Sequence, residues 1–338
     1  MRFAIIGCGL IGGKRLRSLR PGDQVVAVVD PARARAESLA AQAKGAAVLT
    51  DWRAAVERSD VDAVFVATSN DMLAPITLGA ALAGKHVLVE KPAARAPEEL
   101  TPVIAAAEQR GVLVQVGFNH RYHPALQQAR ALFDSGVLGP MMYIRARYGH
   151  GGRLGYDKEW RADPAVSGGG ELLDQGVHLI DLARWFLGDF PHVDGHVATF
   201  FWDMPVEDNG FLFLRTDAGQ VAWLHATWTE WKNTFSFEIF GRDAKLHIEG
   251  LGGSYGTERL SYYKMKPTLG PPDTTIWEYP GEDRSWHLEL EAFAQAIEAR
   301  RAPLVGLRDA QAALEIVHRV YAQSHRDYAR PAGDRGGR

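Results

Sequence analysis

Short apolar runs alternate with longer amphipathic stretches over the first third of the chain. The runs are continuously apolar, which is typical of parallel strands buried on both faces. They occupy residues 3–6, 25–29, 61–67, 86–89 and 113–116, with a shorter one around residue 48. Helical stretches lie between them at residues 33–44, 72–83 and 98–109. This alternation predicts a doubly wound parallel sheet with helices on both faces.

The pattern changes after residue 119. Helices are predicted at residues 124–135 and 171–187, with a strand at 141–148 and a glycine-rich stretch at 150–170 between them. Strands then follow without intervening helices, at residues 193–201, 210–216, 221–229, 235–240 and 245–249. Such a series predicts a large, mostly antiparallel open sheet. Two helices, at 285–300 and 309–324, close the chain.

These two patterns predict an α/β protein with two domains. We place the parallel-sheet domain at residues 1–119, the open-sheet α/β domain at 120–329 and a flexible tail at 330–338. The strands of the open sheet carry Trp223, Trp228, Trp231 and Phe237. The pattern leaves open whether these rings face the core or a second copy of the chain.

The first strand ends in the glycine pattern of a dinucleotide-binding loop. Gly7, Gly9 and Gly12 have the G-x-G-x-x-G spacing where the strand gives way to a helix. These glycines allow a tight turn, close approach of a pyrophosphate and close helix packing, respectively. The pyrophosphate would lie on the free amides that begin the helix, at Leu10 and Ile11. Ordinary turn glycines are the alternative.

Asp30 ends the second strand, about 20 residues beyond the glycines, where an acid accepts hydrogen bonds from the adenosine ribose and repels a 2′-phosphate. We therefore predict a preference for NAD over NADP. Arg33 and Arg35 follow closely and would suit a 2′-phosphate, so NADP remains an alternative. Helix capping is the other role open to Asp30.

Polar residues gather at the carboxyl ends of the predicted parallel strands, where ligands of such sheets bind. They are Thr68, Asn70, Glu90, Lys91, Gly117 and Asn119. Lys91 precedes a proline, which favours an extended backbone and aims the ammonium at the predicted crevice. There it would donate to a reacting oxygen or transfer a proton. A solvated surface lysine is the alternative.

The predicted helix 171–187 carries Asp174 and His178, which are four residues apart and share a helical face. Histidine takes a hydroxyl proton near neutral pH, and Asp174 would orient it or hold a neighbouring hydroxyl. Gly176 costs the helix about 1 kcal/mol relative to alanine. Close approach of another body, such as nicotinamide, would explain that glycine. Capping and polar packing are the alternative for the Asp–His pair.

The same helix face offers a metal-ligand set, formed by Glu171, Asp174, His178 and Asp181. Hydride transfer with a general base needs no metal, and the sequence has no H-E-x-x-H pattern, so we predict none. The only cysteine, Cys8, excludes a disulfide within the chain and a Cys-based metal site.

Charge and hydropathy narrow the possible partners. The net charge is −3 and no basic stripe is present, which argues against binding nucleic acid or a membrane surface. No apolar run approaches the roughly 20 residues of a membrane span. The chain enters a strand directly, without the pattern of a signal peptide, so we expect a cytoplasmic protein.

Five segments together resemble the glucose–fructose oxidoreductase, inositol dehydrogenase and rhizopine-catabolism (Gfo/Idh/MocA) family. In chain order they read AIIGCGLIG, VVDP, VLVEKP, GFNHRYHP and WRADPAVSGGGELLDQGVHLID. The resemblance implies a Rossmann domain that binds NAD(P) and a C-terminal α/β domain whose open sheet forms homodimers or homotetramers. It also implies hydride transfer at a secondary alcohol or hemiacetal carbon of a sugar or cyclitol.

By motif, the resemblance assigns catalysis to Lys91, Asp174 and His178, and leaves open whether Lys91 or His178 is the base. The expected cofactor-binding residues are Gly7, Gly9, Leu10, Ile11, Gly12, Asp30, Thr68, Asn70, Glu90, Lys91 and Asn119. The expected substrate-binding residues are Lys91, Asn119, Arg121, Trp160, Arg161, Asp174 and His178. Many members carry a histidine three or four residues after the position of Asn70, where this chain has Leu73 and Ala74.

The later half resembles family members that act on nucleotide-linked sugars in the synthesis of bacterial surface polysaccharides. Arg153, Lys158, Trp160 and Arg161 would meet a phosphate or a sugar face there, and a charged surface loop is the alternative for them. Inositol or a free sugar is the alternative substrate. A nucleotide-binding sensor without catalysis is the alternative of another class, and the presence of all three catalytic residues argues against it. We expect Lys91 and His178 to act at one nicotinamide ring.

Overall fold

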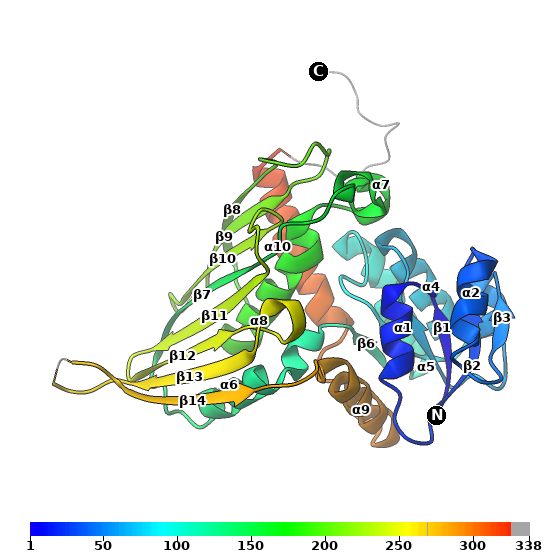
Figure 1. Ribbon diagram of the computed structural model, residues 1–338, viewed down its shortest axis with the longest axis horizontal. Helices are drawn as coiled ribbons and strands as arrows, with labels where there is room; N and C mark the ends of the chain where they lie inside the picture. Colours follow the sequence, from blue (N-terminus) through cyan, green and yellow to red (C-terminus); the bar gives the residue numbers. More distant parts are fainter. Residues whose placement is uncertain (269, 326–338) are drawn as a thin grey trace. The chain divides into compact units, whose positions relative to one another are not determined.

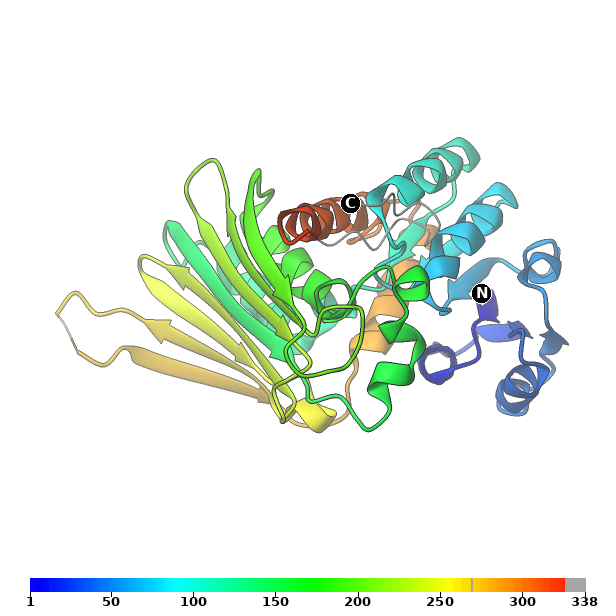
Figure 2. The same ribbon diagram turned by 90° about the horizontal axis from the view of Figure 1, so that it is seen from above.

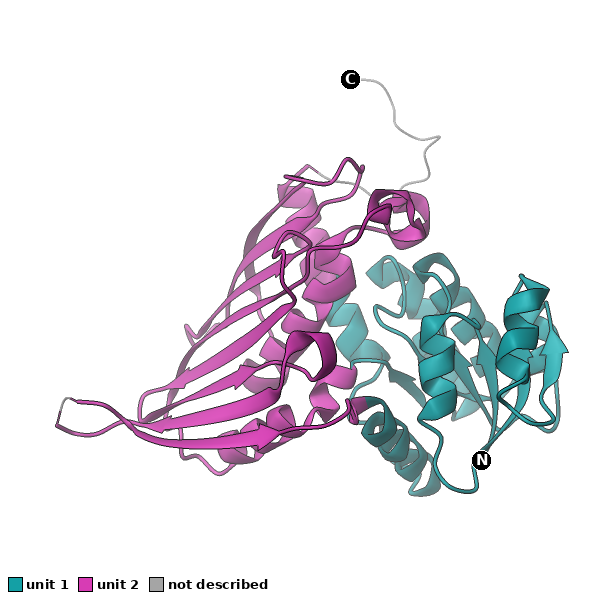
Figure 3. Cartoon of the chain, in the orientation of Figure 1, with its two compact units in different colours: residues 1–118, 286–314 teal, residues 119–285, 315–338 magenta. Residues whose placement is uncertain are grey.

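The computed structural model (Figure 1, Figure 2) describes residues 1–268 and 270–325. The predicted tail at 330–338 lies outside the described residues. The described chain forms two compact units, one of residues 1–118 and 286–314 and the other of residues 119–285 and 315–325 (Figure 3). The sequence placed residues 286–314 in the second domain, whereas they pack within the first unit.

The first unit is built on a six-stranded parallel sheet in the order β3-β2-β1-β4-β5-β6. Its strands are β1 Arg2–Ile6, β2 Gln24–Val29, β3 Ala47–Leu49, β4 Ala63–Val66, β5 His86–Val89 and β6 Val114–Val116. Its helices are α1 Leu10–Arg17, α2 Arg33–Ala40, α3 Trp52–Val56, α4 Asn70–Leu82 and α5 Thr101–Arg110. This is the doubly wound order of a Rossmann fold, which confirms the predicted fold class.

The core of this unit holds the first strands and a helix from near the end of the chain. Phe3 and Phe65 stack with ring centroids 4.6 Å apart. Helix α9 (Ser285–Glu298) adds Leu290 and Phe293 to the same buried cluster. Apolar contact with the sheet is therefore what attaches this late segment to the first unit.

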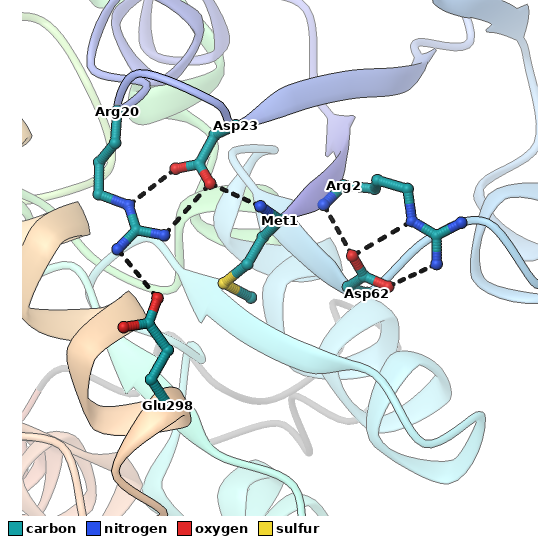
Figure 4. Close-up of polar contacts among 6 residues, drawn as sticks. All are labelled: Met1, Arg2, Arg20, Asp23, Asp62 and Glu298. Atoms are coloured by element: carbon teal, nitrogen blue, oxygen red, sulfur yellow. Dashed lines mark hydrogen bonds and ion pairs between the residues drawn. The ribbon is translucent and has the colours of Figure 1, made fainter.

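Polar contacts surround the N-terminus, and one of them, from Arg20 to Glu298, reaches α9 (Figure 4). The terminal ammonium donates to Asp23 at 2.7 Å, and the Arg20 guanidinium lies between Asp23 and Glu298 of α9. Arg2 binds Asp62 through its side chain at 2.7 Å and through its amide at 2.8 Å. The Arg2–Asp62 pair is exposed and adds little to stability, whereas the Asp23 carboxylate is buried beneath its two partners.

The second unit is built on an eight-stranded sheet in the order β14-β13-β12-β11-β7-β10-β9-β8. Its strands are β7 Met141–Gly149, β8 His192–Ala198, β9 Asn209–Arg215, β10 Val221–Thr227, β11 Thr234–Gly241, β12 Ala244–Glu249, β13 Glu258–Lys264 and β14 Asp273–Tyr279. Only β7 and β10 pair in parallel among these neighbours, which confirms a mostly antiparallel sheet. The sequence missed β13 and β14. Most of β14 is exposed and shows no apolar alternation.

Helices cover one face of this sheet. Helix α6 (Pro124–Asp134) packs on β12, β13 and β14, and α8 (Val177–Leu187) packs on β7 and β10. Helix α10 (Leu307–Gln323) reaches β8 through contacts such as Gln323 with the Val193 carbonyl. The other face carries no helix in the described part of the chain (Figure 2). Trp228 and Phe237 are core residues, whereas Trp223 and Trp231 are exposed.

Candidate active site

The turn after β1 has the geometry that its glycines predict. Gly7 has a φ of +99°, and a Cβ there would lie 2.3 Å from the Ala67 carbonyl oxygen. A Cβ at Gly12 would lie 2.1 Å from the Gly7 carbonyl oxygen, so α1 can pack this closely only with glycine. A Cβ at Gly9 would meet nothing within 4 Å, which leaves space beside the backbone. Tight turn and open space together fit a pyrophosphate.

The start of α1 is suited to an anion. Gly9 is its N-cap residue, and no side chain among the described residues caps the helix there. Leu10 is 76% exposed at this end, an unusual position for a large apolar side chain. Uncapped amides at the positive end of a helix dipole are the groups that hold phosphate in dinucleotide-binding proteins.

Asp30, at the end of β2, is turned toward the glycine loop. Its buried carboxylate accepts hydrogen bonds from the Cys8 amide at 3.0 Å and the Ala32 amide at 2.9 Å. Burial, followed by the charge of Asp30, raises the pKa of the Cys8 thiol to about 12, so the thiol stays protonated. Arg33 pairs with Glu37 at 2.8 Å on the surface of α2, which weakens the case for a 2′-phosphate ligand.

Glu90 and Lys91 follow β5 but have different surroundings. Glu90 is buried and accepts a 2.8 Å hydrogen bond from Arg15 Nε, while Arg15 also binds Glu289 of α9. Burial alone would lower the pKa of Arg15, but the two carboxylates raise it. Lys91 is partly exposed, and its peptide bond to Pro92 is cis. The predicted cofactor residue Glu90 therefore has a structural partner, and Lys91 lies at the rim of the sheet.

The loop after β4 carries the other predicted cofactor residues of the first unit. Thr68 donates to the Ser69 carbonyl at 3.2 Å, and Asn70 is the buried first residue of α4. Leu73 and Ala74 are buried in α4. These two positions contribute to the core of the first unit.

The predicted helix 171–187 is two segments in the structure. A π-helical turn, Leu172–Gly176, contains Asp174, and α8 begins at once with Val177 and contains His178. Single π turns inside helices occur frequently at functional sites. A Cβ at Gly176 would lie 2.8 Å from Leu172 Cδ1 and 3.3 Å from Ala226 Cβ. Packing on β10 therefore explains this glycine, which we had attributed to a nearby ligand.

The Asp174 carboxylate is held by a residue from the preceding loop. Arg161 Nε donates to Asp174 Oδ2 at 3.2 Å, and the guanidinium also lies 3.7 Å from Glu159. Arg161 stacks over the Trp160 ring, with 4.6 Å between guanidinium carbon and ring centroid. Burial by itself lowers the pKa of Arg161, but Asp174 and its other neighbours raise it. Arg161, predicted to bind substrate, thus orients the predicted catalytic acid.

His178 is buried against a second histidine that the sequence did not single out. The His120 ring stacks on it, with centroids 3.8 Å apart and planes 22° apart. His120 also packs edge-on against Tyr148 at 5.1 Å. Burial, followed by Tyr255 and Glu171, raises the pKa of Tyr148, and burial raises that of Tyr255 to about 12. Both phenols therefore stay protonated as hydrogen-bond donors. Nothing in the local pattern of residues 117–124 signals this stacking, because it joins distant segments.

Asn119 and Arg121 flank His120 in a 3₁₀ turn, Asn119–Tyr122. Asn119 donates to the Ser285 hydroxyl at 2.8 Å. Arg121 binds both carboxylate oxygens of Asp181, at 2.8 and 2.6 Å, and the pair is buried. This bidentate pair gives Arg121 a structural role beside its predicted role in substrate binding.

The described residues also bear on metal binding and on membrane insertion. Among the described residues, no cluster of three or more His, Cys, Asp or Glu side chains is arranged to hold a metal ion. Within residues 1–268 and 270–325, no helix has the length and apolar character needed to cross a membrane.

Fold and site together define a dinucleotide-dependent oxidoreductase with a separate α/β domain. Residues 1–118 match the oxidoreductase family with an NAD-binding Rossmann fold, and residues 126–247 match the GFO/IDH/MocA C-terminal domain. The chain therefore belongs to the GFO/IDH/MocA family of oxidoreductases, and its first domain is an NAD-binding domain.

Relatives of known activity act on cyclic alcohols and sugars. Inositol 2-dehydrogenase 2 of Saccharopolyspora erythraea is 34% identical over 83% of this chain and 76% of its own length. The dTDP-3,4-didehydro-2,6-dideoxy-alpha-D-glucose 3-reductase of Streptomyces violaceoruber is 32% identical over 74% of this chain and 72% of its own length. The structure of levoglucosan dehydrogenase with NADH and levoglucosan superposes with a TM-score of 0.85 at 22% identity, covering 96% of this chain and 97% of that one. The chain is thus an enzyme of a family of sugar and inositol dehydrogenases and reductases.

Proposed function

We propose that this enzyme transfers hydride between NAD and a secondary alcohol carbon of a cyclic sugar or cyclitol, with Lys91, Asp174 and His178 as catalytic residues. The observation that carries the proposal is the placement of Asp174 and His178. They lie in consecutive helical segments, Asp174 bound by Arg161 and His178 buried against His120. A nucleotide-binding sensor would have no need of an oriented acid and a buried base.

The first unit would hold the cofactor. The amides that begin α1, the space beside Gly9 and the Asp30 carboxylate fit the pyrophosphate and the adenosine ribose. Bound NAD supplies the hydride acceptor at nicotinamide C4. Asp30 disfavours a 2′-phosphate, so we expect NADH to bind more tightly than NADPH.

The catalytic residues would remove the proton of the substrate hydroxyl in oxidation and return it in reduction. In oxidation, either His178 or Lys91 removes the proton as the carbon gives up hydride, and the other donates a hydrogen bond to the same oxygen. Asp174 accepts a hydrogen bond from a neighbouring hydroxyl of the substrate and so orients the sugar or cyclitol ring. In reduction, the same groups return the proton to the oxygen of the carbonyl.

The ion pairs of the loop favour an uncharged substrate. Arg153 lies 2.6 Å from Glu159, and Arg161 binds Asp174 and Glu159, so carboxylates already partner two of the cations proposed for a phosphate. We therefore favour a free sugar or a cyclitol. A nucleotide sugar of surface-polysaccharide synthesis is the second candidate, supported by the dTDP-sugar reductase among the relatives.

The substrate test is absorbance at 340 nm with purified full-length protein and either NAD⁺ or NADP⁺. The panel contains myo- and scyllo-inositol, glucose, methyl glucosides, levoglucosan and dTDP-glucose. We expect turnover of an uncharged ring with NAD⁺. Turnover of dTDP-glucose alone would favour the second candidate. Intact NADH binding without turnover of any compound would contradict the enzyme and favour a sensor.

We also propose that the uncovered face of the eight-stranded sheet forms a homo-oligomer. Trp223 and Phe213 are each 47% exposed and lie opposite each other in neighbouring strands, with Tyr143 nearby in β7. A group of exposed aromatic side chains on a sheet face is typical of a protein interface.

A further inference from the structure

We propose that Glu207 and Tyr321 are positioning residues that fix the start of the π-helical segment, which carries Asp174 and leads directly into α8 with His178. Both come from parts of the chain far from that segment in sequence, and neither belongs to a motif that the sequence singled out. The inference rests on the proposed function, because it concerns the placement of the proposed catalytic residues.

Glu207 alone holds three consecutive amides. Its Oε2 accepts from Gly170 N at 2.9 Å, its backbone oxygen from Glu171 N at 3.0 Å, and its Oε1 from Leu172 N at 3.1 Å. The first amides of a helix have no partner within the helix and need an outside acceptor. Here the acceptor is a fully buried residue before β9.

Tyr321 of α10 completes this arrangement. Its hydroxyl donates to Glu207 Oε1 at 2.8 Å, and its ring is buried. A Cβ at Gly169 would lie 2.1 Å from the Tyr321 hydroxyl oxygen. A Cβ at Gly170 would lie 1.9 Å from the Glu207 backbone oxygen. Contact with Glu207 and Tyr321 therefore explains why these two positions of the Gly168-Gly169-Gly170 run are glycines.

The arrangement is linked directly to the predicted acid. Asp174 N donates to the Gly170 carbonyl oxygen at 2.9 Å, so Gly170 joins Glu207 to Asp174. Displacement of Gly170 would move Asp174 and, because α8 continues directly from the π-helical turn, also His178. Misplacement of a reacting group by about 1 Å can reduce turnover about 100-fold.

Asp208 provides a matched control. It is the neighbouring buried acid, and it also accepts from three amides, those of Phe200, Phe201 and Trp202, at 2.8 to 3.0 Å. These three amides belong to a different loop from the one held by Glu207, and the remaining donor to Asp208 among the described residues is the side-chain amide of Asn209, at 3.0 Å. Asp208→Asn therefore perturbs a buried acid of the same kind without touching Gly170 or Leu172.

The experiment compares Glu207→Gln, Tyr321→Phe and Asp208→Asn with wild type at pH 8, above the pKa of about 7 that burial gives Glu207. Three measurements are made on each variant. They are the amide hydrogen exchange of residues 168–178, the NADH affinity by fluorescence, and kcat and KM for the substrate that the absorbance test at 340 nm identifies. We expect faster exchange in the first two variants. For Glu207→Gln we expect kcat to fall at least about tenfold with KM and NADH affinity within about twofold. Tyr321→Phe should show a smaller fall in kcat. Asp208→Asn should change neither the exchange of residues 168–178 nor kcat.

An unchanged kcat in both Glu207→Gln and Tyr321→Phe would overturn the proposal, as would an equal fall in Asp208→Asn. If Glu207→Gln does not fold, the proposal is tested by Tyr321→Phe alone, because that variant removes only one hydroxyl. Faster exchange in the variants of an enzyme that turns over no sugar would overturn the proposed function while leaving the contact itself intact. Exchange that stays at the wild-type rate would contradict the contact.

Discussion

A lysine after a buried strand has two roles open to it, surface solvation or chemistry, and its side chain alone does not decide between them. Lys91 differs from its neighbour in this respect. Glu90 is buried and bound to Arg15, whereas Lys91 remains partly exposed at the rim of the sheet. The adjacent carboxylate is therefore used within the fold, and Lys91 is the residue of the pair left at the surface where a ligand would bind.

Lys91→Ala should lower turnover at least about 100-fold, the lower range for acid–base residues, because a hydrogen-bond donor or proton carrier at the reacting oxygen is lost. NADH should still bind. Turnover is measured by absorbance at 340 nm, and NADH affinity is measured by fluorescence titration. Lys264→Ala, an exposed lysine of β13, should leave both unchanged. Turnover near the wild-type value in Lys91→Ala would refute the assignment.

Glu207 makes stability depend on pH. Burial raises its pKa to about 7 from an ordinary 4.5 despite its three donors, so the folded state binds its proton more tightly than the unfolded state. The unfolding free energy should therefore fall as pH rises from about 4.5 to about 7, by up to about 3 kcal/mol. Urea titrations across this range should show that slope, reduced in Glu207→Gln. A difference between wild type and variant that is independent of pH would show that the ordinary pKa is retained.

At the scale of elements, the three glycines of the turn between β1 and α1 are required for different structural reasons. Gly7 adopts a backbone conformation with positive φ, Gly12 lies against backbone, and Gly9 faces open space. The first and third are required by the fold itself. The second would be required only by something that binds.

Gly9→Ala and Gly12→Ala should therefore separate folding from binding. Gly12→Ala should lower the unfolding free energy by about 1 to 3 kcal/mol through overpacking. Gly9→Ala should leave it within about 0.5 kcal/mol. The added methyl group should nevertheless weaken NADH binding about tenfold or more, because it fills the space of the pyrophosphate. Urea denaturation and NADH titration test the pair. Normal NADH affinity in Gly9→Ala would place the pyrophosphate elsewhere.

At the scale of the whole molecule, the eight-stranded sheet has one face covered by helices and one face that is not (Figure 2). On the uncovered face, Arg145 pairs with Glu238 at 2.6 Å beside the aromatic side chains of Trp223 and Phe213. Apolar rings among paired charges match the composition of protein interfaces more closely than that of a solvated sheet.

Trp223→Glu should shift the protein from oligomer to monomer, since a carboxylate would replace a large apolar side chain at the centre of the proposed interface. Light scattering after gel filtration gives the mass. Leu82→Glu, at an apolar residue 44% exposed in the first unit, serves as the control and should keep the oligomer. A monomeric wild type, or a Trp223→Glu variant that is still an oligomer, would contradict the proposed interface.

Local pattern was sufficient for much of the fold. The continuous apolar strands of the first unit and six strands of the second sheet, β7 to β12, lie where their residues predict. The strand β14 was missed because hydrophobic alternation reports burial, and an exposed edge strand has little of it. The cofactor turn was also predictable, since the positive φ of Gly7 and the packing of Gly12 on the Gly7 carbonyl oxygen arise within the turn itself.

The sequence by itself determined the order of elements, the dinucleotide-binding turn and the residue types available for chemistry, because each depends on neighbours along the chain. Only the tertiary structure decided that Arg161 orients Asp174, that His120 stacks on His178 and that Glu207 and Tyr321 hold the glycine run. Those contacts join segments far apart in sequence. Their partners are selected by the packing of the sheet and its helices, so no local pattern records them.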